Sequence, residues 1–123
     1  FALLKPYLAQ IDNIHCLEQI LYSKKLTIAG QVDCIAEYNG KLSVIDFKTS
    51  TKAKYPSSIK NYFMQETCYA TMFEEMYGVP INRIVTIIAV EETGKSQMFV
   101  DKPIHWINPL MDLRNQYRQE HGV

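Results

Sequence analysis

A short turn signal limits the fold of this chain more than any other feature. Asn39-Gly40 lies between Leu26–Tyr38, which is rich in β-branched and apolar residues, and Lys41–Lys48, where apolar and polar residues alternate. Both turn residues tolerate the positive φ that a type I′ turn requires, and such a dipeptide between two strand-like runs predicts a β-hairpin. We therefore expect residues 26 to 48 to form two antiparallel strands joined by a two-residue loop.

The predicted register brings two acidic residues together. Counted outward from the turn, Asp33 opposes Asp46, and directly opposed residues lie on the same face of a hairpin. Side chains alternate between the two faces along a strand, so Lys48 shares that face with Asp46. Nearer to the turn, the same face carries the apolar residues Ile35, Leu42 and Val44.

This group of two acids and a lysine predicts a metal-dependent reaction. Two opposed carboxylates repel each other, and a divalent cation such as Mg²⁺, which takes oxygen ligands, removes that repulsion. Water activation, charge neutralisation and orientation by such a group are what phosphodiester hydrolysis requires. The alternative is a solvated strand face, which is the usual setting of an isolated Asp-x-Lys triplet. The apolar residues around Asp46 and its pairing with Asp33 favour the functional interpretation.

The charge balance and the cysteines restrict the classes of function. The 123 residues, enough for a single domain, include 13 Lys and Arg and 13 Asp and Glu, so attraction for nucleic acid must come from a local basic surface. No apolar run approaches the length of a membrane span and no signal peptide is visible, so we expect no membrane partner. Cys16, Cys34 and Cys68 form no Cys-x-x-Cys pair, which disfavours zinc and is typical of a reducing intracellular compartment.

The segments before the hairpin predict one further strand. Ile14–Ser23 has a mixed pattern, and we interpret it as a strand that pairs with the first hairpin strand across Lys24-Lys25. A helix is the alternative for this segment. Phe1–Gln10 is interpreted as a short helix or the end of a helix, limited by Pro6.

The segments after the hairpin predict two helices and two strands. Ile59–Tyr77 has helical spacing of its large side chains, a capping residue at Ser57 or Ser58, and an end at Gly78-Val79-Pro80. Next come a central strand at Ile81–Glu91, a turn at Thr93-Gly94 and an edge strand at Gln97–Val100. The last element is an amphipathic helix at Trp106–Gln119, with Leu110, Leu113 and Tyr117 on one stripe.

The order of these elements predicts the fold class. Hairpins, helix, strand, strand and helix indicate an α/β or α+β domain, in which helices flank a small mixed central β-sheet. The polar segment 49–58 is interpreted as a loop that contacts phosphate beside the metal site, with a solvated loop as the alternative. Its candidate DNA-binding residues are Thr49, Ser50, Lys52 and Lys54.

Three motifs in order resemble a known family. Gly30 to Asp33, Asp46 to Lys48, and Gln65 to Tyr69 match the GxxD, DxK and QxxxY series of RecB-like nucleases in the PD-(D/E)XK superfamily. Each motif is weak alone, but three in order on strand, strand and helix form a specific signal. The resemblance covers roughly residues 14 to 100, and the hairpin looks most like phage-encoded and mitochondrial genome-maintenance exonucleases. It implies a restriction-endonuclease-like core and exonuclease activity on DNA.

The resemblance also implies roles for single residues. Asp33 and Asp46 would ligate Mg²⁺ or Mn²⁺ together with the backbone carbonyl of Phe47. Lys48 would orient the attacking water or stabilise the developing charge. The residues implied to hold the DNA strand or brace the site are Gln65 and Tyr69, and Glu18 matches an acidic residue often present upstream of GxxD.

The sequence departs from the family pattern at one position. Such exonucleases usually carry a metal-binding His on a helix before this region, and His15 lies too close to Glu18 to match it. We therefore expect a single nuclease domain, residues 1–123, that lacks an N-terminal helix. The alternative to a metal-dependent exonuclease is a non-catalytic nuclease-fold module that binds DNA or a protein partner.

The resemblance finally implies partners and a compartment. DNA is the expected substrate, and a recombination or replication protein is a further expected partner. The cytoplasm of a bacterial or phage-infected cell is favoured over the mitochondrial matrix.

Overall fold

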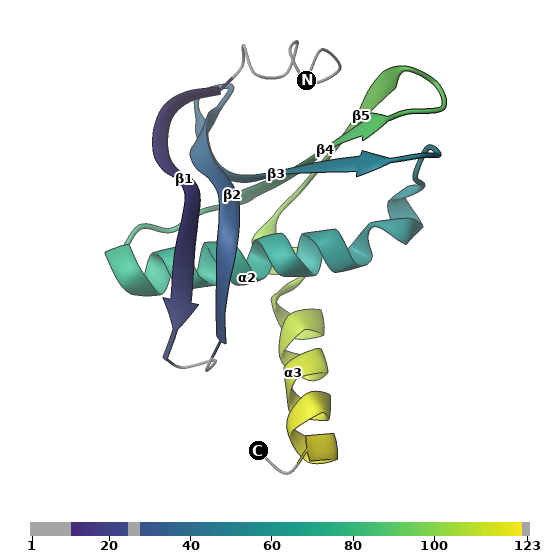
Figure 1. Cartoon of the computed structure of the whole chain (residues 1–123). Helices are drawn as coiled ribbons and strands as arrows, with labels where there is room; N and C mark the ends of the chain where they lie inside the picture. Colours follow the sequence, from purple (N-terminus) through teal and green to yellow (C-terminus); the bar gives the residue numbers. More distant parts are fainter. Residues whose placement is uncertain (1–10, 25–27, 122–123) are drawn as a thin grey trace.

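The chain folds into a mixed five-stranded sheet with a long helix against one face (Figure 1). The computed structural model describes residues 11–24 and 28–121. The strands are β1 (Ile11–Ser23), β2 (Ile28–Tyr38), β3 (Lys41–Ser50), β4 (Arg83–Val90) and β5 (Lys95–Asp101). The helices are α2 (Lys60–Tyr77) and α3 (Ile107–His121), with 3-10 turns η1 (Pro56–Ser58) and η2 (Pro103–His105). This α+β architecture confirms the predicted fold class.

The strand order in the sheet is the same as the order along the chain. Strands β3 and β4 run parallel, while the other neighbouring pairs are antiparallel. Helix α2 makes the crossover between the two parallel strands, as a parallel pair requires. The predicted helix at Ile59–Tyr77, the interior strand before Glu91 and the edge strand around Gln97–Val100 are therefore confirmed.

The central hairpin has the predicted turn and register. Asn39 and Gly40 have φ values of 50° and 80°, as the type I′ interpretation requires. Tyr38 pairs with Lys41, and the antiparallel ladder continues to Cys34 and Ile45. The ladder between β2 and β3 ends there, one residue before Asp33.

Asp33 marks the point where β2 leaves β3. β2 pairs with β1 on both sides of this point, through Cys34 with Leu17 and again through Val32 with Gln19. Glu18, which would oppose Asp33 in this ladder, has a positive φ of 49°. Figure 1 shows the two strands running together past α2 after β3 has diverged. We call this section of β1 and β2, residues 19–23 and 28–32, the β1–β2 arm.

The loss of β3 as a partner coincides with a change in which β2 side chains face α2. Ile35 and Val32 both belong to the core beneath α2, although an uninterrupted strand would place residues three apart on opposite faces. The strand therefore switches faces around Asp33. This switch lets the arm bury Leu21 and Val32 against the helix while the hairpin buries Ile35 and Val44.

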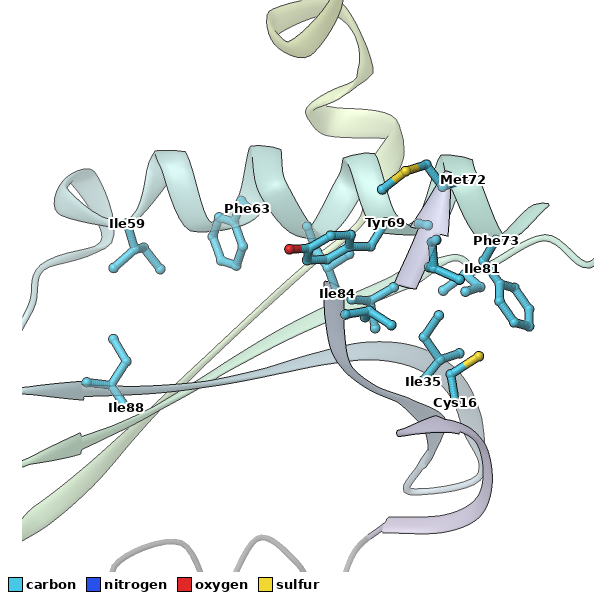
Figure 2. Close-up of a cluster of buried hydrophobic side chains, with 14 of the residues drawn as sticks. Cys16, Ile35, Ile59, Phe63, Tyr69, Met72, Phe73, Ile81, Ile84 and Ile88 are labelled. Carbon is cyan, nitrogen blue, oxygen red and sulfur yellow. The ribbon is translucent and has the colours of Figure 1, made fainter. Parts of the chain in front are cut away.

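Two apolar clusters lie on opposite faces of the sheet. The larger cluster joins the sheet to α2, and Figure 2 shows Ile59, Phe63, Tyr69 and Phe73 of the helix region with Ile35, Ile84 and Ile88 of the strands. The second cluster contains the alternate strand residues Cys34, Ala36, Tyr38, Ile45, Val85 and Ile87. Because β4 is buried on both faces, its sequence is a nearly continuous apolar run.

Two boundary predictions around α2 are wrong. Thr49 and Ser50 belong to β3 and not to a loop, because they continue its parallel pairing with β4 at Ala89 and Val90. The helix has Ile59 at its N-cap position with no side-chain cap hydrogen bond, so neither of the predicted serines caps it. Both serines lie in η1 instead. The C-terminal end of the helix is as predicted, at Gly78 with a φ of 71°.

The terminal segments differ in how far the structure describes them. Helix α3 is present where a helix was predicted, but Leu113 is 52% exposed, so its apolar stripe is only partly buried. Phe1–Gln10, the residues Lys25–Thr27 and the side chain of Tyr117 lie outside the described part of the chain. No helix among the described residues is both long enough and apolar enough to cross a membrane.

Candidate active site

Asp33 and Asp46 meet where the two hairpin strands separate. Asp46 lies on β3, where it pairs with Thr86 of β4, and is 4% exposed. The Phe47 N–H donates to Asp33 Oδ2 at 3.0 Å. In a continuing antiparallel ladder this N–H would donate to the carbonyl of Val32. The Asp33 side chain thus replaces a backbone acceptor, and this contact holds its carboxylate beside Asp46.

Lys48 places its ammonium group against this acid pair. Its Nζ lies 3.1 Å from Asp46 Oδ2 and 5.0 Å from the centre of the Tyr62 ring. The contact with Asp46 is an ion pair without good hydrogen-bond geometry, so Oδ2 has no hydrogen-bond donor among the described residues. Lys48 Nζ also approaches Gln65 Oε1 at 3.4 Å, a long contact.

The glycine and the QxxxY residues contact each other. Gln65 Nε2 donates to the Tyr69 hydroxyl at 3.0 Å, and the ring of Tyr69 lies against Gly30. A Cβ added to Gly30 would be only 3.0 Å from Tyr69 Cε1, closer than such atoms normally approach. Gly30 therefore leaves room for Tyr69, which holds Gln65 next to Lys48.

Burial and charge change the pKa values of the central residues. Burial raises the pKa of Asp46 to about 7, with a further increase from the neighbouring Asp33 carboxylate that Lys48 only partly offsets. Burial alone would lower the pKa of Lys48, but the carboxylates of Asp46 and Asp33 outweigh it and raise this pKa. The lysine is therefore a permanent positive charge, whereas the acid pair can hold a proton near neutral pH.

Glu66 is a site residue that the sequence analysis did not identify. It is fully buried on α2, its Oε2 accepts a hydrogen bond from the Thr86 hydroxyl, and its Oε1 has no partner among the described residues. Burial raises the pKa of Glu66 well above its usual value, and the charge of Asp46 adds to this increase. The available signal was its position, since Glu66 lies between the buried Phe63 and Ala70 on the stripe that faces the sheet.

The oxygen atoms of this site fit a divalent cation. Asp46 Oδ2 is buried, lacks a hydrogen-bond donor among the described residues, and neighbours a second carboxylate. Mg²⁺ commonly binds one or two carboxylates and keeps several waters. The described residues contain no cluster of three or more His, Cys, Asp or Glu that could hold a metal. Asp33 and Asp46 are the carboxylates that would hold such an ion.

Glu18 and His15 lie on β1, before the acid pair in the chain, and metal binding by Glu18 stays a prediction. The Glu18 side chain is exposed and forms no three-residue cluster with the aspartates, and its carbonyl accepts from Gln31 Nε2 at 3.1 Å. His15, which the sequence analysis excluded as the family's upstream His, is exposed and packs edge-on against Phe73.

The segment after Lys48 is anchored to the sheet. The Ser50 hydroxyl donates to the Lys52 carbonyl at 2.6 Å, and the Gln97 side chain bonds both the N–H and the carbonyl of Lys54 at 2.8 and 2.9 Å. Thr49 alternates to the face opposite Lys48. The described contacts do not join the side chains of these four residues to the acid pair, so their role in DNA binding stays a prediction.

Sequence comparisons place the chain among nucleases. A model of the PD-(D/E)XK nuclease superfamily matches residues 5–115. Mitochondrial genome maintenance exonuclease 1 of Xenopus tropicalis is 29% identical over 119 residues, or 92% of this chain. The mouse and human proteins of the same name are 47% and 45% identical over 47 residues, or 38% of this chain. The aligned regions cover 34% of the frog protein and 14% of each mammalian one, so this chain spans about a third of such a relative.

A structural comparison supports the same fold. The crystal structure of a candidate exonuclease from Eubacterium rectale superimposes with a TM-score of 0.58 over 96% of this chain and 49% of that one. The sequence identity is 10%, so the likeness concerns the fold alone. The predicted resemblance and the restriction-endonuclease-like core are confirmed together.

Proposed function

The chain belongs to the PD-(D/E)XK nuclease superfamily, and from that membership we propose that it is a metal-dependent DNA exonuclease or its catalytic core. The observation that carries the proposal is the convergence of Asp33 and Asp46 beside Lys48, at the point where β2 and β3 separate. The exonuclease names of its relatives support DNA as the substrate. Both phage-type and genome-maintenance activities fit this site.

Each residue of the site has a proposed task. Asp33 and Asp46 would hold Mg²⁺ or Mn²⁺, with the carbonyl of Phe47, whose N–H is fixed by Asp33, as a further ligand. When bound, the metal ion supplies an activated water and neutralises phosphate charge. Lys48 directs its ammonium at the attacking water or at a phosphate oxygen. The α2 residues Gln65 and Tyr69 keep Lys48 in place by their hydrogen bond and contacts.

The experiment that tests this proposal is a cleavage assay with matched variants. Labelled single- and double-stranded DNA is incubated with the protein in Mn²⁺ and in Mg²⁺, beside Asp46→Asn and Asp33→Asn. We expect terminal degradation by the wild type and none by either variant. Internal cuts without release of terminal nucleotides would contradict exonuclease activity, and equal degradation by Asp46→Asn would exclude this site.

A second candidate function is a non-catalytic module that binds DNA or a protein partner. The observation that favours it is that the described residues offer two acidic ligands without a third. DNA binding without cleavage in either metal would support this alternative. A recombination or replication protein remains the proposed protein partner in both cases.

The cysteines support a proposed compartment. Cys16, Cys34 and Cys68 are all unpaired, and burial raises the pKa of each thiol, which makes them unreactive. We propose a reducing intracellular compartment, the cytoplasm of a bacterial or phage-infected cell ahead of the mitochondrial matrix.

A further inference from the structure

A large hollow lies at the end of the sheet far from the acid pair. Its volume is about 710 Å³, and it is bounded by the start of β3, the start of β4 and the segment from β5 into η2. We call it the basic hollow, because Lys41, Arg83 and Lys102 all line it. Lys41 begins β3, whereas Asp46 and Lys48 lie towards the other end of that strand.

The positive charges of the basic hollow are not neutralised by ion pairs. None of the three cations forms a salt bridge among the described residues. Arg83 uses one of its five N–H donors on the carbonyl of Tyr38, at 3.1 Å, and its other donors have no acceptor among the described residues. Asp101 also lines the hollow, but its oxygens bond the N–H groups of Lys102 and Trp106 and the ring of His105.

The candidate active site has the opposite charge balance. The two carboxylates of Asp33 and Asp46 outnumber the single cation Lys48, and the chain as a whole has a net charge of zero. A polyanion such as DNA gains affinity mainly from cations that contact its phosphates. The attraction that brings DNA to such an acidic site must therefore come from cations elsewhere on the surface.

The walls of the hollow suit a nucleic-acid strand. Val100 and Ile104 are 47% and 76% exposed there, so apolar surface lies next to the cations. A DNA strand presents phosphates beside sugars and bases, and such a wall can cover them. Asp46 lies five residue steps after Lys41 along β3, or roughly 17 Å at about 3.3 Å per residue. That length corresponds to about five nucleotides at 3.4 Å per base step.

We propose that the basic hollow is a second DNA contact, which binds the phosphates of the same strand about five nucleotides from the cleaved bond. This inference rests on the proposed function, because it takes DNA as the substrate. The contact would anchor the strand without taking part in the chemistry. A free nucleotide also carries phosphate, so the test distinguishes binding of a DNA strand from binding of a free nucleotide.

The test measures DNA binding by the metal-free protein, so that it does not depend on cleavage. Anisotropy of a labelled single strand of roughly 20 nucleotides is followed at several salt concentrations for the wild type and for Lys41→Ala/Lys102→Ala. We expect the double variant to bind about tenfold more weakly or worse, and the slope of log affinity against log salt to fall by about 2, one for each lysine. Lys24→Ala, at an exposed lysine directly after β1, is the control and should bind as the wild type does.

Two further measurements identify the ligand that occupies the basic hollow. Ile104→Ser should weaken DNA binding several-fold without changing the salt slope, because it removes apolar contact and no charge. Deoxyadenosine monophosphate should compete poorly with the strand. The proposal is overturned if the double variant and the wild type bind DNA equally, if Lys24→Ala loses as much affinity, or if the mononucleotide binds as tightly as the strand. DNA binding that depends on the lysines without any cleavage would refute the exonuclease proposal alone.

Discussion

Lys48 has two proposed tasks at the acid pair, which mutation can separate. As a counter-charge it offsets Asp33 and Asp46, and as a catalytic group it must place its ammonium against water or phosphate. We expect Lys48→Ala to keep the fold and DNA binding but to lower single-turnover cleavage in Mn²⁺ by about 10² or more, the scale for removing one electrostatic stabiliser. Cleavage within a few-fold of the wild type would remove Lys48 from the mechanism.

The raised pKa of Asp46 predicts how stability changes with pH. Its pKa rises from 3.8 to about 7 on folding without metal, so the folded protein binds more protons than the unfolded chain between these values. The stability associated with this proton is fully present below about pH 4 and is lost as pH rises through about 7. We expect melting temperatures of the metal-free protein to show this loss, and those of Asp46→Asn to lack it. A wild type that gains stability relative to the variant over this range would contradict the assignment.

Gly30 is expected to act through Tyr69. A methyl group on Gly30 would crowd the Tyr69 ring, so Gly30→Ala should destabilise the protein by about 1–3 kcal/mol, the usual cost of overpacking. The shifted ring should also release Gln65 and slow cleavage. Urea unfolding and cleavage assays measure the two effects. Tyr69→Leu provides the control, because Gly30→Ala should cost less stability in that background.

At the level of elements, α2 supports the lysine as well as the core. The Tyr62 ring lies 5.0 Å from Lys48 Nζ, and such cation–π contacts depend on the ring and not on the hydroxyl. We expect Tyr62→Phe to retain cleavage and Tyr62→Leu to lower the rate constant at saturating DNA several-fold. A purely structural role would instead lower the melting temperature of Tyr62→Leu with no change in that rate constant.

Much of the element-level structure could be predicted from the sequence. The Asn39-Gly40 turn fixes the hairpin register, since its geometry permits few alternatives, and apolar periodicity locates α2. The separation of β2 from β3 at Asp33 could not be predicted, because it depends on the packing of the β1–β2 arm against α2 and not on local propensity. Glu66 was missed for a similar reason, since its environment comes from Thr86 on a different strand.

For the whole molecule, bound metal should appear as added stability. A ligand that binds only the folded state stabilises it by about 2.7 kcal/mol at a concentration of 100 times its Kd. We expect Mg²⁺ and Mn²⁺ to raise the melting temperature of the wild type at pH 8, above the pKa of Asp46, and less so at pH 5, where a proton on Asp46 competes with the metal. Asp46→Asn should show neither increase. Equal shifts in the variant would indicate that the metal binds elsewhere.

The separation of the strands at Asp33 also places the two aspartates in parts of the sheet that should open at different rates. Asp46 lies on β3, which is covered on both faces, whereas Asp33 adjoins the β1–β2 arm, whose outer face exposes Ile20 and Tyr22. Amide protons of such a half-covered arm should exchange with deuterium before those of β3 and β4. Each opening of the arm would carry one carboxylate away from the other. An ion held between them would then close the arm, and the lifetime of the bound metal would report how often it opens.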